Sequence, residues 1–263
     1  MEKQGIVTYF VGTAGAGKST LCGATKDWCT NHGIDAILVN LDPGVENLPY
    51  EPDIDVRDWV SLKEVMRTHG LGPNGAQIAA CDMIALQGER LTKALEEFRS
   101  DYVLVDTPGQ IELFVFRQSG KYITELLQPE RSVIAYCVDP LLAKSPSSFV
   151  SQLMLAVSVQ FRLQLPLVHL LTKADLLDEE ELKGILAWSQ DSMELERSVQ
   201  EEAESMYREM SVDLFRVIEG MGALPNVYPT SAQTGDGLDD LYAHIQQSFG
   251  GGDDIGTEDP DKL

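Results

Sequence analysis

The stretch Gly12–Ser19 constrains this chain most strongly, because it reads GTAGAGKS and matches the pattern G-x-x-x-x-G-K-[ST]. An apolar run, Ile6–Val11, precedes it and predicts a buried strand, whereas the residues from Thr20 to about Asn31 predict a helix. Glycines in such a loop let backbone N–H groups surround a phosphate at a helix N-terminus, where the helix dipole also favours an anion. The pattern therefore predicts a loop that binds the phosphates of a nucleotide.

Individual positions of this loop have distinct expected contacts. We expect Lys18 to reach the β- and γ-phosphates and Ser19 to hold Mg²⁺. Backbone groups supply the other contacts. The predicted nucleotide-binding residues of this stretch are Gly12, Gly15, Ala16, Gly17, Lys18, Ser19 and Thr20.

The length and apolar content suit a globular protein. A chain of 263 residues with 43% hydrophobic residues can bury the core of one large α/β domain. Only one strand fits before the phosphate-binding loop, so no leader peptide is expected, and no later apolar run is long enough to cross a bilayer. We therefore expect a cytoplasmic protein without membrane contact. No C-x-x-C pair occurs among the cysteines, so we expect reduced thiols and no zinc at Cys22, Cys29, Cys81 and Cys137.

The charge balance is strongly acidic, with 42 acidic and 20 basic residues and a net charge of −22. Such a surface repels nucleic acids and anionic membranes, and the sequence holds no basic cluster that offsets this, so no direct nucleic-acid binding is expected. Two explanations stay open. The simpler one is adaptation to a salt-rich cytoplasm, which screens self-repulsion. The other is a surface that binds a basic partner.

A second carboxylate follows the next predicted strand. The apolar run Ile34–Leu41 ends in Asp42-Pro43-Gly44, and ligands of open α/β sheets bind at this edge. Asp42 can orient a metal-bound or attacking water there; the alternative is an ordinary turn aspartate before a proline. The polar residues Val45–Asp58 then predict a loop in the place of a nucleotide-sensing segment.

Two helices are predicted between the second and third buried strands. Asp58 is the expected N-cap of a helix over Trp59–His69, and a longer helix is expected from Ala76 to about Phe98. The tight loop between them contains Gly72-Pro73-Asn74. Taken alone, that tripeptide indicates only a turn.

The third buried strand, Tyr102–Val105, leads into the sequence DTPGQIE. Asp106 is expected to bind a metal-bound water, and the Gly109 amide is expected to meet the γ-phosphate. Gln110 and Glu112 stand where a residue that positions the hydrolytic water is wanted. The sequence does not decide between these two.

Two later strand ends predict the recognition of a base. The strand Leu165–Leu171 leads into Thr172-Lys173-Ala174-Asp175, where the Asp175 carboxylate can accept from N1–H and N2–H₂ of guanine and the Lys173 stem can lie over the ring. Adenine offers no such donor pair, so GTP is the predicted nucleotide. The alternative for this segment is a strand end before a capped helix. After a short strand, Asn226–Pro229, backbone amides of Ser231 and Ala232 are expected at guanine O6.

The remaining segments complete an α/β pattern. We expect one domain over residues 1–249, with a helical insertion over 58–98, an acidic helical segment of two or three pieces over 176–222, and an acidic, disordered tail over 250–263. The other predicted elements are a strand at Ser132–Val138 and helices at Pro146–Leu163 and Gly237–Phe249.

Together, the phosphate-binding loop, both acidic strand ends and the base-recognition sequence resemble a P-loop GTPase. Gly72-Pro73-Asn74 between two helices, with Asp42-Pro43 upstream and DTPGQIE downstream, closely resembles the GPN-loop GTPases over about Gly5–Phe249. The resemblance implies a three-layer P-loop NTPase fold of the signal-recognition class. Its mostly parallel sheet is flanked by helices, and a helical insertion carries the GPN loop.

The same resemblance implies a Mg²⁺-dependent enzyme that hydrolyses GTP to GDP and phosphate as a homodimer. Each GPN loop would reach into the partner's site, so that Asn74 stabilises charge near the other subunit's γ-phosphate. Asp42, Gln110 and Glu112 match family positions around the hydrolytic water. The apolar faces of the Ala76–Phe98 and Pro146–Leu163 helices are candidates for the dimer surface, and intramolecular core is the alternative.

One position departs from the commoner GTPase pattern. Thr172 stands where asparagine is more frequent. Guanine preference depends on Asp175 and is little affected, but the contact that tethers this loop to the phosphate-binding loop is left open. Eukaryotic members of the family are associated with assembly and nuclear import of RNA polymerase. This acidic chain is more similar to an archaeal member, for which the resemblance supplies no client protein.

Two other functions compete with a fast GTPase. One is an assembly chaperone or binding module in which hydrolysis is slow and secondary. The other is a P-loop ATPase or small-molecule kinase, which needs a phosphoacceptor pocket that the sequence does not show.

Overall fold

A computed structural model describes residues 5–127, 129–222 and 226–249, and its centre is a seven-stranded sheet in the order β3-β2-β4-β1-β5-β6-β7. The central strand β1 (Ile6–Gly12) lies between β4 (Tyr102–Asp106) and β5 (Ser132–Val138). Every pair of neighbouring strands is parallel; the outer strands are β2 (Ala36–Asn40), β3 (Ile54–Asp55), β6 (Leu167–Leu171) and β7 (Val227–Pro229). Their carboxyl ends therefore share one edge, where ligands of such sheets bind.

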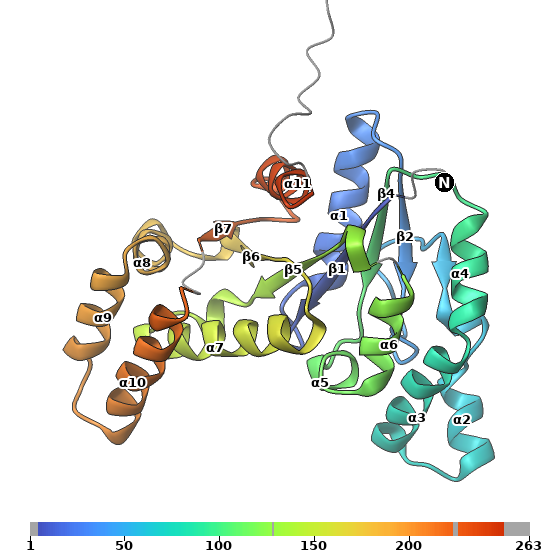
Figure 1. The fold of residues 1–263 in the computed structure, drawn as a ribbon, viewed down its shortest axis with the longest axis horizontal. Coiled ribbons are helices and arrows are strands. Elements are labelled where there is room, and N and C mark those ends of the chain that lie inside the picture. Colours follow the sequence, from blue (N-terminus) through green and yellow to red (C-terminus); the bar gives the residue numbers. More distant parts are fainter. Residues whose placement is uncertain (1–4, 128, 223–225, 250–263) are drawn as a thin grey trace, which may run out of the picture.

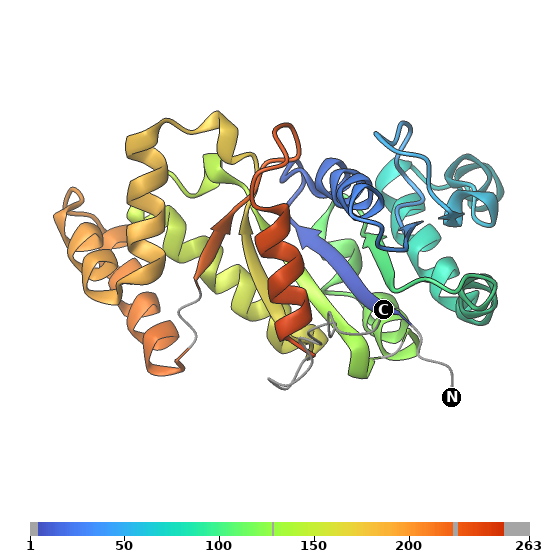
Figure 2. The same ribbon diagram turned by 90° about the horizontal axis from the view of Figure 1, so that it is seen from above.

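Helices cover both faces of this sheet (Figures 1 and 2). One face packs against α1 (Lys18–Asn31) and α11 (Leu238–Gln247). The helices of the other face are α3 (Pro73–Leu86), α5 (Ile111–Phe114), α6 (Gln118–Leu126) and α7 (Pro146–Leu163). The three-layer α/β architecture predicted from the sequence is therefore confirmed.

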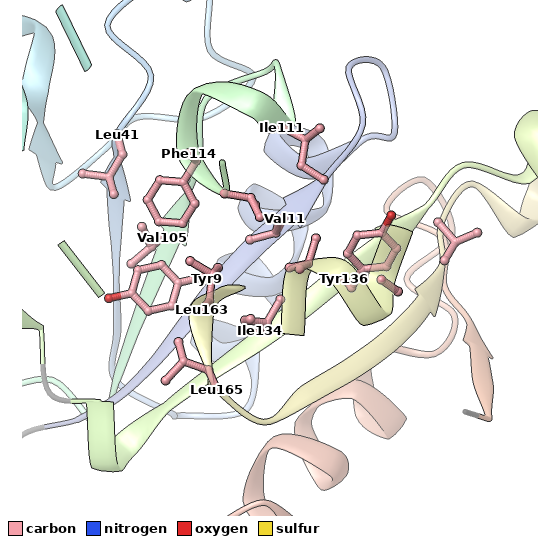
Figure 3. Close-up of a cluster of buried hydrophobic side chains, with 14 of the residues drawn as sticks. Tyr9, Val11, Leu41, Val105, Ile111, Phe114, Ile134, Tyr136, Leu163 and Leu165 are labelled. Atoms are coloured by element: carbon pink, nitrogen blue, oxygen red, sulfur yellow. The ribbon is translucent and has the colours of Figure 1, made fainter. Parts of the chain in front are cut away.

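The alternation of side chains along β1 explains the two cores. Phe10 packs with the α1 and α11 layer, whereas Tyr9 and Val11 belong to the opposite core, because successive strand residues point to opposite faces. Figure 3 shows the latter core, in which Phe114 of α5 lies near Tyr9 with 5.9 Å between ring centroids. Both faces of the sheet are buried, which is why its strands are continuous apolar runs.

Two helical groups extend the molecule beyond the sheet at opposite ends (Figure 1). One end holds α2 (Leu62–His69), α3 and α4 (Gly88–Glu96). The other end holds the three helices of the acidic segment, α8 (Glu179–Gln190), α9 (Ser192–Glu201) and α10 (Met206–Gly220). The prediction of two or three pieces for that segment is confirmed as three.

The helix boundaries near the predicted GPN loop require three corrections. The expected single helix Ala76–Phe98 begins earlier, at Pro73, and is divided into α3 and α4 at Gln87. Gly88 allows that break to pack against α6, because a Cβ there would lie 2.5 Å from Leu126 Cδ2. Asp58 does not cap the first helix; the Ser61 side chain does, by accepting from the Glu64 amide.

Other predicted bounds agree with the structure, and a few elements were missed. β5 and α7 have the bounds that the sequence predicts. The predicted loop Val45–Asp58 contains β3, a two-residue edge strand too short to leave an apolar run, and α5 and α6 were not predicted. The predicted disordered tail lies outside the described residues, and the single-domain division stays a prediction.

Candidate nucleotide-binding site

The loop after β1 has the conformation that its glycines permit. Gly15 and Gly17 have φ angles of 82° and 86°, in the left-handed region that side chains disfavour, and Gly17 begins α1 as its N-cap. Gly12 is required for a different reason, since a Cβ there would lie 2.5 Å from the Cys137 carbonyl oxygen of β5. The loop therefore turns its backbone toward the N-terminus of α1, where an anion is favoured.

Lys18 is buried beneath this loop, and its ammonium group donates to backbone carbonyl oxygens. Its Nζ donates to the carbonyls of Gly12 at 3.2 Å, Thr13 at 3.0 Å and Gly109 at 3.0 Å. Burial lowers the pKa of Lys18, while neighbouring groups that include Asp106 and Asp42 oppose this shift. The ammonium group thus lies between the phosphate-binding loop and the loop after β4.

Asp106, at the end of β4, is a buried carboxylate that is only partly satisfied. Its Oδ2 accepts from the Tyr50 hydroxyl at 2.8 Å, whereas its Oδ1 is buried without a hydrogen-bond partner in the described part of the chain. Burial raises the pKa of Asp106 to about 6, and the hydroxyls of Ser19 and Tyr50 act in the opposite direction. The orphaned oxygen is therefore a buried acceptor that a donor or a hard cation can complete.

The donor chemistry here suits Mg²⁺. The Ser19 hydroxyl and the Asp106 carboxylate are neighbouring oxygen donors, and Mg²⁺ in nucleotide sites commonly uses one or two protein groups with phosphate and water. No cluster of three or more histidine, cysteine, aspartate or glutamate side chains suited to a metal occurs within the described residues. A Mg²⁺ ion held by these two oxygen donors would need phosphate or water oxygens to complete its coordination.

Asp42 joins the ends of β2 and β4. Its Oδ1 accepts from the Gly44 amide at 2.8 Å, a turn contact, and its Oδ2 accepts from the Gly109 amide at 2.9 Å. The expected turn role is therefore present, and a second contact to the loop after β4 accompanies it. In this conformation the Gly109 amide, expected to meet a γ-phosphate, donates to Asp42.

The segment between β2 and β3 is held by residues that the sequence did not single out. The Tyr50 ring packs on α1, where a Cβ at Gly23 would lie 3.2 Å from the Tyr50 Cβ. Arg57 forms an ion pair of 2.6 Å with Asp55 and donates to the Val45 carbonyl at 3.0 Å. The only sequence signal for Tyr50 is that it is an aromatic residue in a loop predicted to be polar.

The base-recognition loop is tethered to the phosphate-binding loop despite its threonine. The Thr172 Oγ1 donates to the Ala16 carbonyl at 2.6 Å, which answers the question that the sequence left open. Lys173 Nζ donates to the Gly15 carbonyl and lies 3.2 Å from Asp139 Oδ2. Asp139 was not predicted as a site residue. Its position could have indicated one, because Asp139 directly follows the apolar strand β5, just as Asp106 ends the apolar strand β4.

Asp175 lies exposed on the short 3₁₀ turn Ala174–Leu176, beside the loop that follows β7. The Ala174 amide donates to the Thr230 carbonyl at 3.1 Å, so the two loops are joined. The Ser231 hydroxyl accepts from the amides of Gln233 at 3.2 Å and Thr234 at 3.1 Å, which orders the second loop. Ala232, next to Ser231, is half-buried on this same loop.

The residues predicted around the hydrolytic water are less constrained. Gln110, the N-cap residue of α5, and Glu112, in its first turn, are both exposed, and neither side chain makes a hydrogen bond within the described chain. They lie next to Gly109 at the same sheet edge. The structure therefore leaves both side chains free to contact a ligand and does not choose between them.

The predicted GPN loop occupies the start of α3. Gly72 is the N-cap, Pro73 is the first helical residue, and Asn74 is exposed, with a side chain that makes no hydrogen bond to any described residue. One turn further on, Gln77 packs so closely on the turn after Asp42 that a Cβ at Gly44 would lie 2.6 Å from Gln77 Nε2. The loop is thus anchored beside the site, but Asn74 makes no contact with it.

A parallel sheet whose central strand leads into this glycine-rich loop and helix defines a P-loop nucleoside triphosphatase. A family model described as a conserved hypothetical ATP-binding protein matches residues 10–251. GPN-loop GTPase 1 of Schizosaccharomyces pombe is 33% identical over 256 residues, which cover 93% of this chain and 69% of that protein. The GPN-loop GTPase PAB0955 of Pyrococcus abyssi is 41% identical over 178 residues, which cover 67% of this chain and 70% of that protein.

A solved structure agrees with these sequence matches. The crystal structure of PAB0955, a GTPase in apo form, superposes with a TM-score of 0.83 at 35% identity and covers 93% of this chain and 97% of that one. This chain belongs to the GPN-loop GTPase family. It spans 61% of the length of GPN-loop GTPase 1 of Dictyostelium discoideum, which is 32% identical to it.

Proposed function

We propose that this chain is a Mg²⁺-dependent GTPase that hydrolyses GTP to GDP and phosphate as a homodimer, with each active site completed by the partner's GPN loop. The observation that carries the proposal is the site around Asp106. A buried carboxylate oxygen without a partner lies there beside the phosphate-binding loop and the buried Lys18. Such a group is costly to bury unless a ligand completes it.

The phosphate end of the site is assigned to the loop after β1. Backbone amides of Gly12–Ser19 and Thr20 surround the phosphates, and Lys18 exchanges its carbonyl partners for phosphate oxygens. Ser19 and Asp106 would hold Mg²⁺, which, when bound, neutralises charge on the β- and γ-phosphates. The Gly109 amide leaves Asp42 and donates to the γ-phosphate.

The guanine end is assigned to the joined loops after β6 and β7. Asp175 accepts from two guanine donors, Lys173 lies along the base, and amides of Ser231 and Ala232 face guanine O6. Thr172 positions this loop through its bond to Ala16. A site built to hydrogen-bond a donor pair discriminates strongly against a base that lacks it.

We assign the hydrolytic water to Asp42, Gln110 and Glu112. In support, Asp42 accepts from the Gly109 amide, and Gln110 and Glu112 follow Gly109 at the start of α5. Asn74 acts in trans. It is exposed on the first turn of α3, a helix start with no acidic residue in that turn, so its end of the helix favours the negative charge of a partner's γ-phosphate. Gly72 and Pro73 set the start of that helix.

The homodimer surface is proposed on the side of α3 and α7. Most of the apolar residues of α7, such as Phe149 and Leu153, are buried. For these residues the alternative given above, intramolecular core, holds. However, Leu86 of α3 is 87% exposed and Phe161 of α7 is 78% exposed. These two exposed side chains lie on the two helices that the family resemblance names as candidates for the dimer surface, which is the support for this placement.

The cycle is proposed to control a surface for a protein client. RNA polymerase, with which eukaryotic members of the family are associated, is one candidate. A slowly hydrolysing assembly chaperone, a P-loop ATPase and a kinase are the competing functions. None of the described helices is long and apolar enough to cross a bilayer. The cytoplasmic location and the lack of direct nucleic-acid contact stay expectations from the sequence.

The test is phosphate release from GTP and from ATP with Mg²⁺, together with mass in solution. Wild type should prefer GTP by about a hundredfold or more. Asn74→Ala should lose about a hundredfold in turnover while it stays dimeric, as expected for one removed charge-stabilising donor. Asn31→Ala, at the exposed end of α1, is the matched control and should turn over normally. ATP preference, or full turnover by Asn74→Ala, would refute the proposal.

A further inference from the structure

The apolar face of helix α10 is about twice as wide as the part of that face that is buried in the core. At about 100° per residue, its apolar side chains span roughly two-thirds of the helix circumference. One half of this face, with Phe215 and Ile218, is buried, and α10 packs against α7 and α9. The other half is exposed; it consists of Met206 (76%), Tyr207 (71%), Met210 (53%), Val217 (53%) and Met221 (61%). We call these five residues the α10 stripe.

The α10 stripe is unusual in composition as well as exposure. Three of its members are methionines, and the whole chain has only eight. Methionine is flexible and polarisable, so surfaces rich in it can adapt to several partner shapes. Exposed apolar side chains scattered singly need no explanation, whereas a contiguous helical row indicates a contact.

The surroundings of the stripe are acidic. Residues 176–222 contain thirteen acidic and four basic side chains. The basic ones are engaged locally: Lys183 pairs with Glu179, Arg197 with Glu194, Arg216 with Glu196, and Arg208 donates to backbone carbonyls. Glu204, Glu209 and Glu219 make no ion pair within the described residues. The negative charge around the stripe is therefore left largely uncompensated.

We infer that the α10 stripe is a docking surface for a basic amphipathic helix of a partner protein. An apolar row receives the apolar face of such a helix, as in helix-in-groove recognition, while lysine and arginine on its flanks meet the acidic rim. This assignment also gives the acidic composition a function, which the sequence left open as a surface for a basic partner.

Two other occupants fit less well. A second copy of this chain would bring two acidic surfaces together, and like charges in contact repel. The chain's own segment 250–263 is acidic too, with five acidic residues and one lysine. Charge complementarity therefore favours a different, basic partner.

The inference rests on the proposed function in one respect, the existence of a protein client, and it specifies where that client binds. It does not depend on the trans active site, because α10 lies at the opposite end of the molecule from α2–α4 (Figure 1). Binding and hydrolysis can therefore fail separately. A protein that hydrolyses GTP but does not bind a basic helix would refute only this inference. The converse result would refute only the proposed enzyme.

The experiment uses the full chain with methyl-labelled methionine and a synthetic leucine–lysine peptide of about 18 residues, with leucines at helical spacing. The peptide should shift the methyl signals of Met206, Met210 and Met221. Signals of the half-buried Met66 and Met83, on α2 and α3, should stay in place. A scrambled peptide of equal composition and charge should bind at least about tenfold more weakly, because it has no apolar face.

Variants separate the stripe from general attraction to an acidic protein. The triple change Met206→Gln, Met210→Gln and Val217→Gln should weaken binding about tenfold or more and leave GTP turnover unchanged. Leu141→Gln is the matched control, since Leu141 is also exposed but lies outside α10. Binding should also weaken as salt is raised. Equal binding of both peptides, unaffected binding by the triple variant, or stripe signals that shift with protein concentration alone would overturn the inference.

Discussion

The two helical groups at the ends of the sheet differ in charge and in what they contact. Residues 58–98, which include α2–α4, contain six acidic and four basic side chains, whereas residues 176–222, which include α8–α10, contain thirteen and four. The first group contacts the nucleotide edge, through Gln77 at Gly44. The second group carries none of the assigned site residues and exposes an apolar stripe.

This difference teaches which end suits which partner. Two identical copies can approach through a nearly neutral surface without strong repulsion, as the proposed trans active site requires. An acidic end suits a partner of opposite charge instead. The comparison predicts that changes at one end alter turnover and that changes at the other alter client binding.

The largest expected effect is a difference in the free energy of unfolding between substitutions on the buried half and on the exposed half of α10. Phe215→Ala should lower the free energy of unfolding by about 3 to 5 kcal/mol, because Phe215 is 1% exposed and its removal leaves a cavity. Met210→Ala, one turn away on the exposed half, should stay within about 0.5 kcal/mol of wild type. Urea unfolding measures both. Similar losses for the two variants would show that the stripe is part of the core.

A smaller effect concerns how the acidic end joins the sheet. His169 of β6 lines a pocket with Gly222, which follows α10, and burial lowers the pKa of His169 to about 3 from 6.5. The unfolded chain therefore binds the proton more readily between these values, so stability falls as the pH drops below about 6.5. Between about pH 7 and pH 5, wild type should lose about 2 kcal/mol more than His169→Gln. Parallel pH profiles of unfolding free energy would contradict a buried neutral histidine.

The smallest effect concerns the nucleotide edge. Tyr50→Phe removes the hydrogen bond to Asp106 and should destabilise the nucleotide-free protein by about 1 to 2 kcal/mol, as expected for a bond to a charged group. Tyr122→Phe is the control, since Tyr122 is 48% exposed and its hydroxyl makes no hydrogen bond within the described residues. Thermal unfolding without nucleotide measures the difference. An unchanged midpoint for Tyr50→Phe would remove this tyrosine from the site.

Much of the site was predictable because its chemistry is local in sequence. Gly12–Ser19, Asp106 and Asp175 each lie at or just after the end of an apolar strand, and parallel strands carry their carboxyl ends to one edge. Thus a sequence pattern and one rule of topology place these groups together.

The contacts that the sequence did not reveal join residues far apart in the chain. Tyr50 meets Asp106, and Thr172 meets Ala16, through bonds that no spacing rule predicts. The break between α3 and α4 was also missed; Gly88, directly after it, packs against Leu126 of α6. Local helical periodicity alone favours one continuous helix there.

The most direct test of the central claim is a heterodimer assembled from two inactive chains. One chain carries Lys18→Ala and keeps its GPN loop; the other carries Asn74→Ala and keeps its phosphate-binding loop. Co-expression with two different tags isolates the mixed dimer. If Asn74 acts in the partner's site, this dimer has one complete site and should recover about half of wild-type GTP turnover. A mixed dimer as inactive as its parents would contradict the account.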